Sequence, residues 1–204
     1  EGAGATQGRI RIAASEVVAA EVLPEVLAGF AARNPGITLD VAGRDRAEDL
    51  LTREADLAVR MVRPGQAALV ARRVAVAGIG LYAAPAYAVR EGVPDSEHAL
   101  AAHCLIGPET AARLGGARFG ARPADPGDFA FRSDSDAVQL AMVRAGMGIG
   151  ACQHGVAARH GLVRVVPEWE IRLDVWLAMH EDQRGNVSLR RLWDHLALSL
   201  PGAF

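Results

Sequence analysis

Two polar segments of the sequence have the residue types and the spacing that favour anion binding. Ser15 ends an alternating polar–apolar run and precedes apolar residues at helical spacing, so it is a candidate helix N-cap. Ser133, Asp134 and Ser135 stand in the same way before a helix expected to begin near Asp136. Because helix N-termini present unpaired N–H groups and a partial positive charge, both segments are candidate ligand sites. Plain capping is the alternative, and the two carboxylates of the second segment would repel an anionic ligand.

Two arginines stand where a guanidinium could clamp an anion. All 22 Lys+Arg residues of the chain are arginine. Arg44 falls in the loop after the second expected strand, and Arg60 ends the third. A guanidinium binds a carboxylate through two parallel hydrogen bonds, which makes both residues candidate ligand contacts. An exposed loop arginine, for the first, and an arginine that pins a neighbouring loop, for the second, are the alternatives.

Gln153 and His154 form a third polar site, at the end of a strand of small residues. Two polar side chains there could set the choice of ligand, and a histidine can change its charge near neutral pH. The alternative is that both are ordinary surface residues.

Enzyme chemistry finds little support in the sequence. Cys152 lies close to His154, but it falls inside an apolar strand, whereas a nucleophilic thiolate must be exposed. Cys152, His154 and His160 match no zinc spacing. The glycines of Gly146–Gly150 follow a helix and lead into a strand, the reverse of a dinucleotide loop. We therefore expect no catalytic residue, no metal and no cofactor.

Composition excludes several classes of protein. The 204 residues carry a formal net charge of -2, and a pI of about 6.3 argues against a nucleic-acid-binding domain. No apolar run approaches the ~18 residues of a membrane span, and no signal peptide is visible. The chain lacks an initial methionine, so we expect a fragment or a processed product. Cys104 and Cys152 form no disulfide framework and are expected to be two buried thiols in a reducing compartment.

The order of predicted elements indicates an α/β protein with two lobes. Alternating strands and helices at the start imply parallel strand pairing. We expect one lobe from residues 1–77 plus 178–204, a second from 78–177, and long extended strands between them. In such sheets ligands bind beyond the carboxyl ends of the strands. The expected strands are 9–13, 37–41, 57–59, 72–84, 105–106, 147–152, 162–166 and 171–179, with a hairpin over 118–132; the main helices follow Ser15 and span 45–54, 136–145 and 186–200.

Several segments, in order along residues 8–200, resemble the effector-binding domain of LysR-type transcriptional regulators. No single segment is specific, but their order is. They are Gly8–Ser15, Leu23-Pro24, Phe30–Pro35, Ala55–Arg60, Leu81–Tyr87, Gly92–Pro94, His103–Leu105, Ala145–Gly150 and Gly161–Pro167.

The resemblance implies a type 2 periplasmic-binding-protein-like fold of two Rossmann-like subdomains joined by crossing strands. It places the Ser15 junction and the Arg44 loop at an effector cleft between the lobes. It also implies a cytoplasmic homodimer, within a tetramer in the full protein, that contacts DNA through an N-terminal helix-turn-helix absent from this chain. The expected ligand is a small metabolite, such as a small organic acid, and no membrane is involved.

A solute-binding protein of a transport system, with its signal peptide removed, is the alternative function. It would share the fold and the ligand cleft. A helix-turn-helix encoded upstream indicates regulation, and a signal peptide indicates transport.

Overall fold

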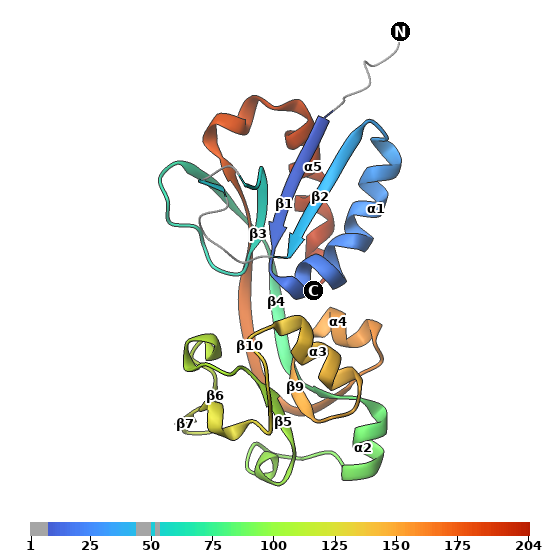
Figure 1. Ribbon diagram of the computed structural model, residues 1–204, viewed down its shortest axis with the longest axis vertical. Coiled ribbons are helices and arrows are strands. Elements are labelled where there is room, and N and C mark those ends of the chain that lie inside the picture. Colours follow the sequence, from blue (N-terminus) through green and yellow to red (C-terminus); the bar gives the residue numbers. More distant parts are fainter. Residues whose placement is uncertain (1–7, 44–49, 52–53) are drawn as a thin grey trace. The chain divides into compact units, whose positions relative to one another are not determined.

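The computed structural model describes residues 8–43, 50–51 and 54–204 (Figure 1). The chain forms two compact units, the first from residues 1–77 and 173–204 and the second from residues 78–172. It passes from one unit to the other inside strand β4 (Leu69–Ala83) and again inside strand β10 (Val163–His180). The second passage lies between Arg172 and Leu173, whereas the sequence pattern placed it at 177/178.

The sheet of the first unit is parallel along its outer strands. Strand β1 (Gly8–Ala14) lies between β2 (Ile37–Gly43) and β3 (Leu57–Arg60), parallel to both. Strand β10 continues the sheet antiparallel to β3. Because β1, β2 and β3 run in one direction, their carboxyl ends meet at the same edge of the sheet. Of the predicted residues, Ser15 directly follows β1 and Arg60 ends β3.

Two helices pack beside this sheet (Figure 1). Helix α1 (Leu23–Arg33) continues from a π-helical turn at Val18–Val22, and Pro24, which has no N–H to donate, stands at the join. Helix α5 (Val187–Ser199) is capped by Asn186, whose side chain accepts a hydrogen bond from Leu189 N at 3.1 Å. Helices α1 and α5 contact each other, and His195 of α5 packs against Phe30 of α1 and donates a hydrogen bond from Nε2 to the Val26 carbonyl at 2.8 Å. Their fully buried side chains include Leu23, Leu189, Leu192 and Leu196.

The second unit is built around strand β9 (Ile149–Gln153). Its neighbours are β4, which is antiparallel to it, and β5 (Leu105–Gly107), which is parallel. Strand β8 (Phe131–Arg132) adds to β5 in parallel, so the carboxyl ends of β5, β8 and β9 share one edge. The helices of this unit are α2 (Pro85–Glu91), α3 (Asp136–Arg144) and α4 (His154–Arg159).

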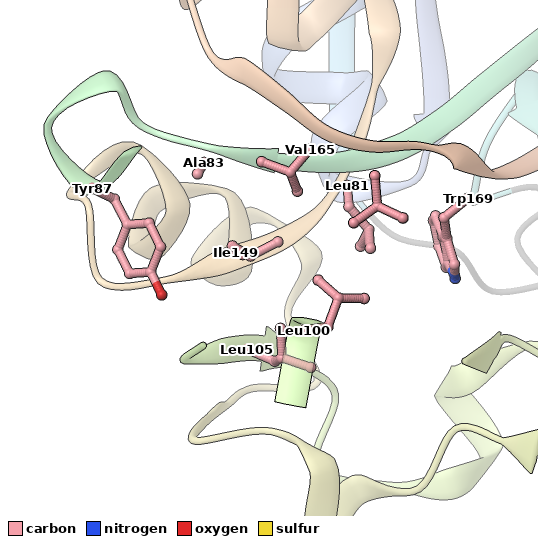
Figure 2. Close-up of a cluster of buried hydrophobic side chains, with 9 residues drawn as sticks. Leu81, Ala83, Tyr87, Leu100, Leu105, Ile149, Val165 and Trp169 are labelled. Atoms are coloured by element: carbon pink, nitrogen blue, oxygen red, sulfur yellow. The ribbon is translucent and has the colours of Figure 1, made fainter. Parts of the chain in front are cut away.

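The core of the second unit brings together apolar side chains from β4, α2, β5, β9 and β10 (Figure 2). Leu81 of β4, Ile149 of β9 and Val165 of β10 are each at most 4% exposed. Trp169 is also buried, and its Nε1–H donates to the carbonyl of Arg118 at 2.8 Å. Burial of an aromatic side chain with its polar atom satisfied stabilises the unit without an unpaired donor.

The hairpin predicted over 118–132 is wrong in its pairing. Strand β6 (Arg118–Phe119) pairs with β7 (Arg122–Pro123), and β8 instead joins β5. Phe119 and Phe129 do meet, with ring centroids 6.2 Å apart, but as a side-chain contact. The last two predicted strands, 162–166 and 171–179, are one continuous strand, β10.

Candidate functional site

Ser15 directly follows β1, at the carboxyl edge of the first sheet. Its carbonyl accepts a hydrogen bond from Ala19 N at 2.8 Å, so the chain turns into a helix immediately after it, as predicted. Ala14, the residue before it, is paired with Gly43 at the end of β2. Arg44, predicted as an anion clamp, lies outside the described residues.

Arg60 is the last residue of β3 and is buried, with 7% of its surface exposed. It stands opposite Trp176 of β10 and lines a cavity of about 230 Å³ within the first unit. Gln66 lines the same cavity, and its Oε1 is buried with no hydrogen-bond partner among the described residues. A buried arginine is therefore held at the same sheet edge as Ser15, within the first unit.

Ser133 and Ser135 organise the start of α3. The hydroxyl of Ser135 accepts a hydrogen bond from Val138 N at 3.3 Å, which is N-cap geometry. The hydroxyl of Ser133 accepts from Ser135 N at 3.1 Å, and its carbonyl accepts from Gln139 Nε2 at 2.7 Å. Ser135 is thus the N-cap of α3.

Asp134 is engaged by the loop that follows β5. Its Oδ1 accepts hydrogen bonds from Glu109 N at 2.9 Å and from Thr110 N at 3.2 Å, and Thr110 Oγ1 donates to Oδ2 at 3.1 Å. Asp136, the first residue of α3, pairs with Arg113 at 3.0 Å. The negative charges of Asp134 and Asp136, which were expected to repel an anion, are therefore partly neutralised by hydrogen-bond donors of the same unit.

Gln153 ends β9 and His154 begins α4. Nδ1 of His154 lies 2.7 Å from the hydroxyl of Tyr82, and Nε2 lies 3.6 Å from Oε2 of Glu170. Glu170 also accepts a hydrogen bond from Arg164 Nη2 at 3.0 Å. The side chain of His154 is 30% exposed. The side chain of His154 is therefore held by more contacts than expected of an ordinary surface residue.

Sequence reasoning missed the partners of His154, which are Tyr82, Arg164 and Glu170. They belong to strands far along the chain, and no local spacing connects them to His154. One signal was present: Gly78 and Gly80 alternate on β4, and a Cβ at Gly78 would lie 2.5 Å from His154 Cδ2. Alternate glycines in a strand indicate the close approach of another group.

The structure groups the predicted residues within each unit. In the first unit, Ser15 and Arg60 stand at the carboxyl ends of neighbouring parallel strands. In the second unit, Ser133 and His154 follow β8 and β9, the two strands that flank β5. This is the edge at which open α/β sheets bind ligands.

Other chemistry is sparse in the described part of the chain. Among these residues no group of three or more His, Cys, Asp or Glu side chains could hold a metal ion, and no helix has the length and apolar character of a membrane span. Neither cysteine forms a disulfide with the other: Cys152 is buried, as expected, but Cys104 is exposed, contrary to expectation. Cys104 precedes β5, where its backbone N–H donates to the Tyr87 hydroxyl. A separate cavity of about 470 Å³ in the second unit lies between Leu100 and Phe119.

Comparison with known proteins shows which family and which solved structures this chain resembles. The family model of the LysR substrate binding domain matches residues 3–200. The chain is 26% identical, over 96% of its length and 67% of the relative's, to the probable HTH-type transcriptional regulator LtrA of Klebsiella pneumoniae. Its structure is similar to the regulatory domain of CrgA, a LysR-type regulator from Neisseria meningitidis (TM-score 0.84, 21% identity, 95% of this chain and 99% of that one). It is also similar to the regulatory domain of AphB from Vibrio vulnificus (TM-score 0.73, 20% identity, 94% and 98%).

Proposed function

The chain belongs to the LysR substrate-binding domain family, as the effector-binding regulatory domain of a LysR-type transcriptional regulator, and from this premise we propose which residues hold its effector. The fold is the mixed α/β, type 2 periplasmic-binding-protein-like fold of these regulatory domains, as expected. The family consists of non-enzymatic regulators that act in the cytoplasm, so neither an enzyme nor the transport alternative is retained.

We propose that the effector binds at the carboxyl ends of the parallel strands β1 and β3 and of β5, β8 and β9. The observation that carries this proposal is the strand topology: Ser15 and Arg60 lie at the ends of β1 and β3, and Ser133 follows β8. Ser135, Asp134, Gln153 and His154 belong to the same edge of the second unit. Arg44 follows β2 in the sequence and is included on that ground alone.

The chemistry of these groups favours a small organic acid. Serine hydroxyls and the N–H groups at the start of α3 donate hydrogen bonds to a carboxylate. Any cationic contact must come from arginine or protonated histidine, because the chain has no lysine. Asp134 does not oppose this assignment strongly, since its carboxylate already accepts hydrogen bonds from Glu109 and Thr110.

In this account the effector acts by differential affinity. A ligand shifts a regulator only when it binds one arrangement of the protein more tightly than another. We propose that the domain self-associates as a dimer, within a tetramer of the full protein. DNA would be contacted by a helix-turn-helix domain outside this chain.

Calorimetric titration of the domain with a panel of small carboxylates tests the proposal. We expect at least one acid to bind with one site per chain, and Ser15→Ala and Ser133→Ala each to weaken it about tenfold, the loss of one hydrogen bond to a charged group. Ser96→Ala is the matched control, because Ser96 lies away from these strand ends, where its hydroxyl donates to Asp95 and accepts from Ala99 N. Tight binding that neither edge variant weakens would contradict the site.

A further inference from the structure

The imidazole of His154 rests directly on the backbone of β4. A Cβ at Gly78 would lie 2.5 Å from Cδ2 and 2.7 Å from Nε2 of His154, and a Cβ at Gly80 would lie 3.1 Å from its Cε1. Any side chain at Gly78 would therefore displace the ring, since Cβ contacts under 3.0 Å do not occur. Gly78 and Gly80, called here the glycine seat, leave the space that the ring of His154 occupies.

The hydrogen bond to Tyr82 constrains the protons of the ring. The Tyr82 hydroxyl, whose residue is 6% exposed, lies 2.7 Å from His154 Nδ1. When His154 is neutral and Nδ1 accepts this hydrogen bond, the ring proton is on Nε2. That nitrogen is buried and has no hydrogen-bond partner within normal distance among the described residues, although Glu170 Oε2 lies 3.6 Å away.

The charges around the ring nearly cancel when the histidine is neutral. From β10, Arg164 contributes one positive charge and Glu170 one negative charge, and the two are joined at 3.0 Å. The hydroxyl of Tyr82, from β4, and the thiol of Cys152, from β9, are both uncharged near neutral pH. The cluster of Tyr82, His154, Arg164 and Glu170 thus has a net charge of zero, which becomes +1 when His154 takes up a proton.

We propose that His154 takes up a proton when an anionic effector binds, so that the affinity of the domain for its effector rises as the pH falls. This inference rests on the proposed function, because it needs an anion at the edge of the sheet where β9 ends. Protonation is compatible with the contacts present: Nδ1–H would donate to the Tyr82 oxygen, and Nε2–H would face Glu170.

The sign follows from linkage between the proton and the ligand. An extra positive charge at the carboxyl edge attracts the anion, and by reciprocity the bound anion favours the protonated ring. The uptake of one proton raises affinity by at most about tenfold per pH unit. We expect an increase of about three- to tenfold between pH 8 and pH 6.

The state of the free protein can be checked without any ligand. In a ¹⁵N-labelled domain at pH 8, we expect the ring nitrogens of His154, assigned by their loss in His154→Gln, to show the Nε2–H tautomer. Tyr82→Phe should lower the fraction of that tautomer. A doubly protonated ring at pH 8 in the free protein would overturn the inference, because no proton could then be taken up on binding.

Proton uptake on binding is measured by calorimetry with benzoate, succinate and sulfate, each in two buffers of different ionisation enthalpy at pH 7. We expect net proton uptake by the unchanged domain and by His98→Gln, and none by His154→Gln. Binding without proton uptake, or uptake retained in His154→Gln, would overturn this inference and leave the proposed function intact. If no anion binds at any pH, both proposals fail.

Discussion

The carboxylate of Asp134 holds the backbone of Thr110. Oδ1 accepts from Thr110 N at 3.2 Å, and the Thr110 hydroxyl donates to Oδ2 at 3.1 Å. Asp134 precedes α3, and Thr110 follows β5, so this contact fixes a loop at the carboxyl edge of the second unit. The sequence predicted Asp134 as part of a ligand site, and the structure gives it at least this structural task.

Replacing Asp134 with alanine should destabilise the domain by about 1–2 kcal/mol, because two backbone N–H groups lose a charged acceptor. Asp134→Asn, which keeps one oxygen acceptor, should lose less. Urea denaturation followed by tryptophan fluorescence measures both values. Equal stability of Asp134→Ala and the unchanged domain would show that the loop is held by other contacts.

The glycine seat predicts a specific coupling between two positions. Gly78→Ala should cost about 1–3 kcal/mol, as overpacking does, because the new Cβ meets the ring of His154. In a His154→Ala background the same change should cost much less, which gives a measurable coupling energy in a double-mutant cycle. Gly65→Ala is the control, since a Cβ there meets no atom within 4 Å. Additive costs would contradict the predicted contact.

Two buried tyrosines predict a loss of stability in alkali. Burial raises the pKa of both Tyr82 and Tyr87 above the ordinary value of 10.0. Above pH 10 the unfolded chain therefore releases these protons before the folded protein does, so the free energy of unfolding falls as the pH rises through the folded pKa values. Below pH 10 the two hydroxyls contribute no pH dependence.

The measurement is denaturation at pH 8 to 11, together with absorbance titration of the tyrosines, which number only two in the chain. The Tyr82→Phe/Tyr87→Phe double variant should be less stable at pH 8 but show a shallower alkaline decline. Normal titration of both hydroxyls at pH 10 in the folded domain would contradict the prediction.

Sequence patterns predicted the parts of the fold that depend on neighbouring residues. The strand before Ser15 and the helix that follows it were correct, because their apolar spacing is local. The hairpin over 118–132 was wrong, because Phe131 pairs with Ile106, and only tertiary packing decides between that partner and Phe119. The side-chain partners of His154 could not be predicted for the same reason, since Tyr82 is 72 positions away in the sequence.

The sequence allowed us to predict which residues lie at strand ends and helix starts, but not which side chains contact one another there. Strand ends and helix starts can be located from periodicity, so Ser15, Ser133 and Ser135 were singled out correctly as junction residues. Nothing in the sequence showed that the carboxylate of Asp134 is used by the loop at Thr110. Such pairings depend on which strand ends share an edge, and that is a property of the sheet order.

The proposed anionic effector would bind at the carboxyl ends of the parallel strands, beside Ser15 and Ser133. The most direct test is a crystal structure of the domain with the carboxylate that calorimetry identifies. We predict that the carboxylate contacts Ser15 of the first unit and Ser133 of the second. Density for the acid in the cavity between Leu100 and Phe119, with both serines unoccupied, would contradict the account.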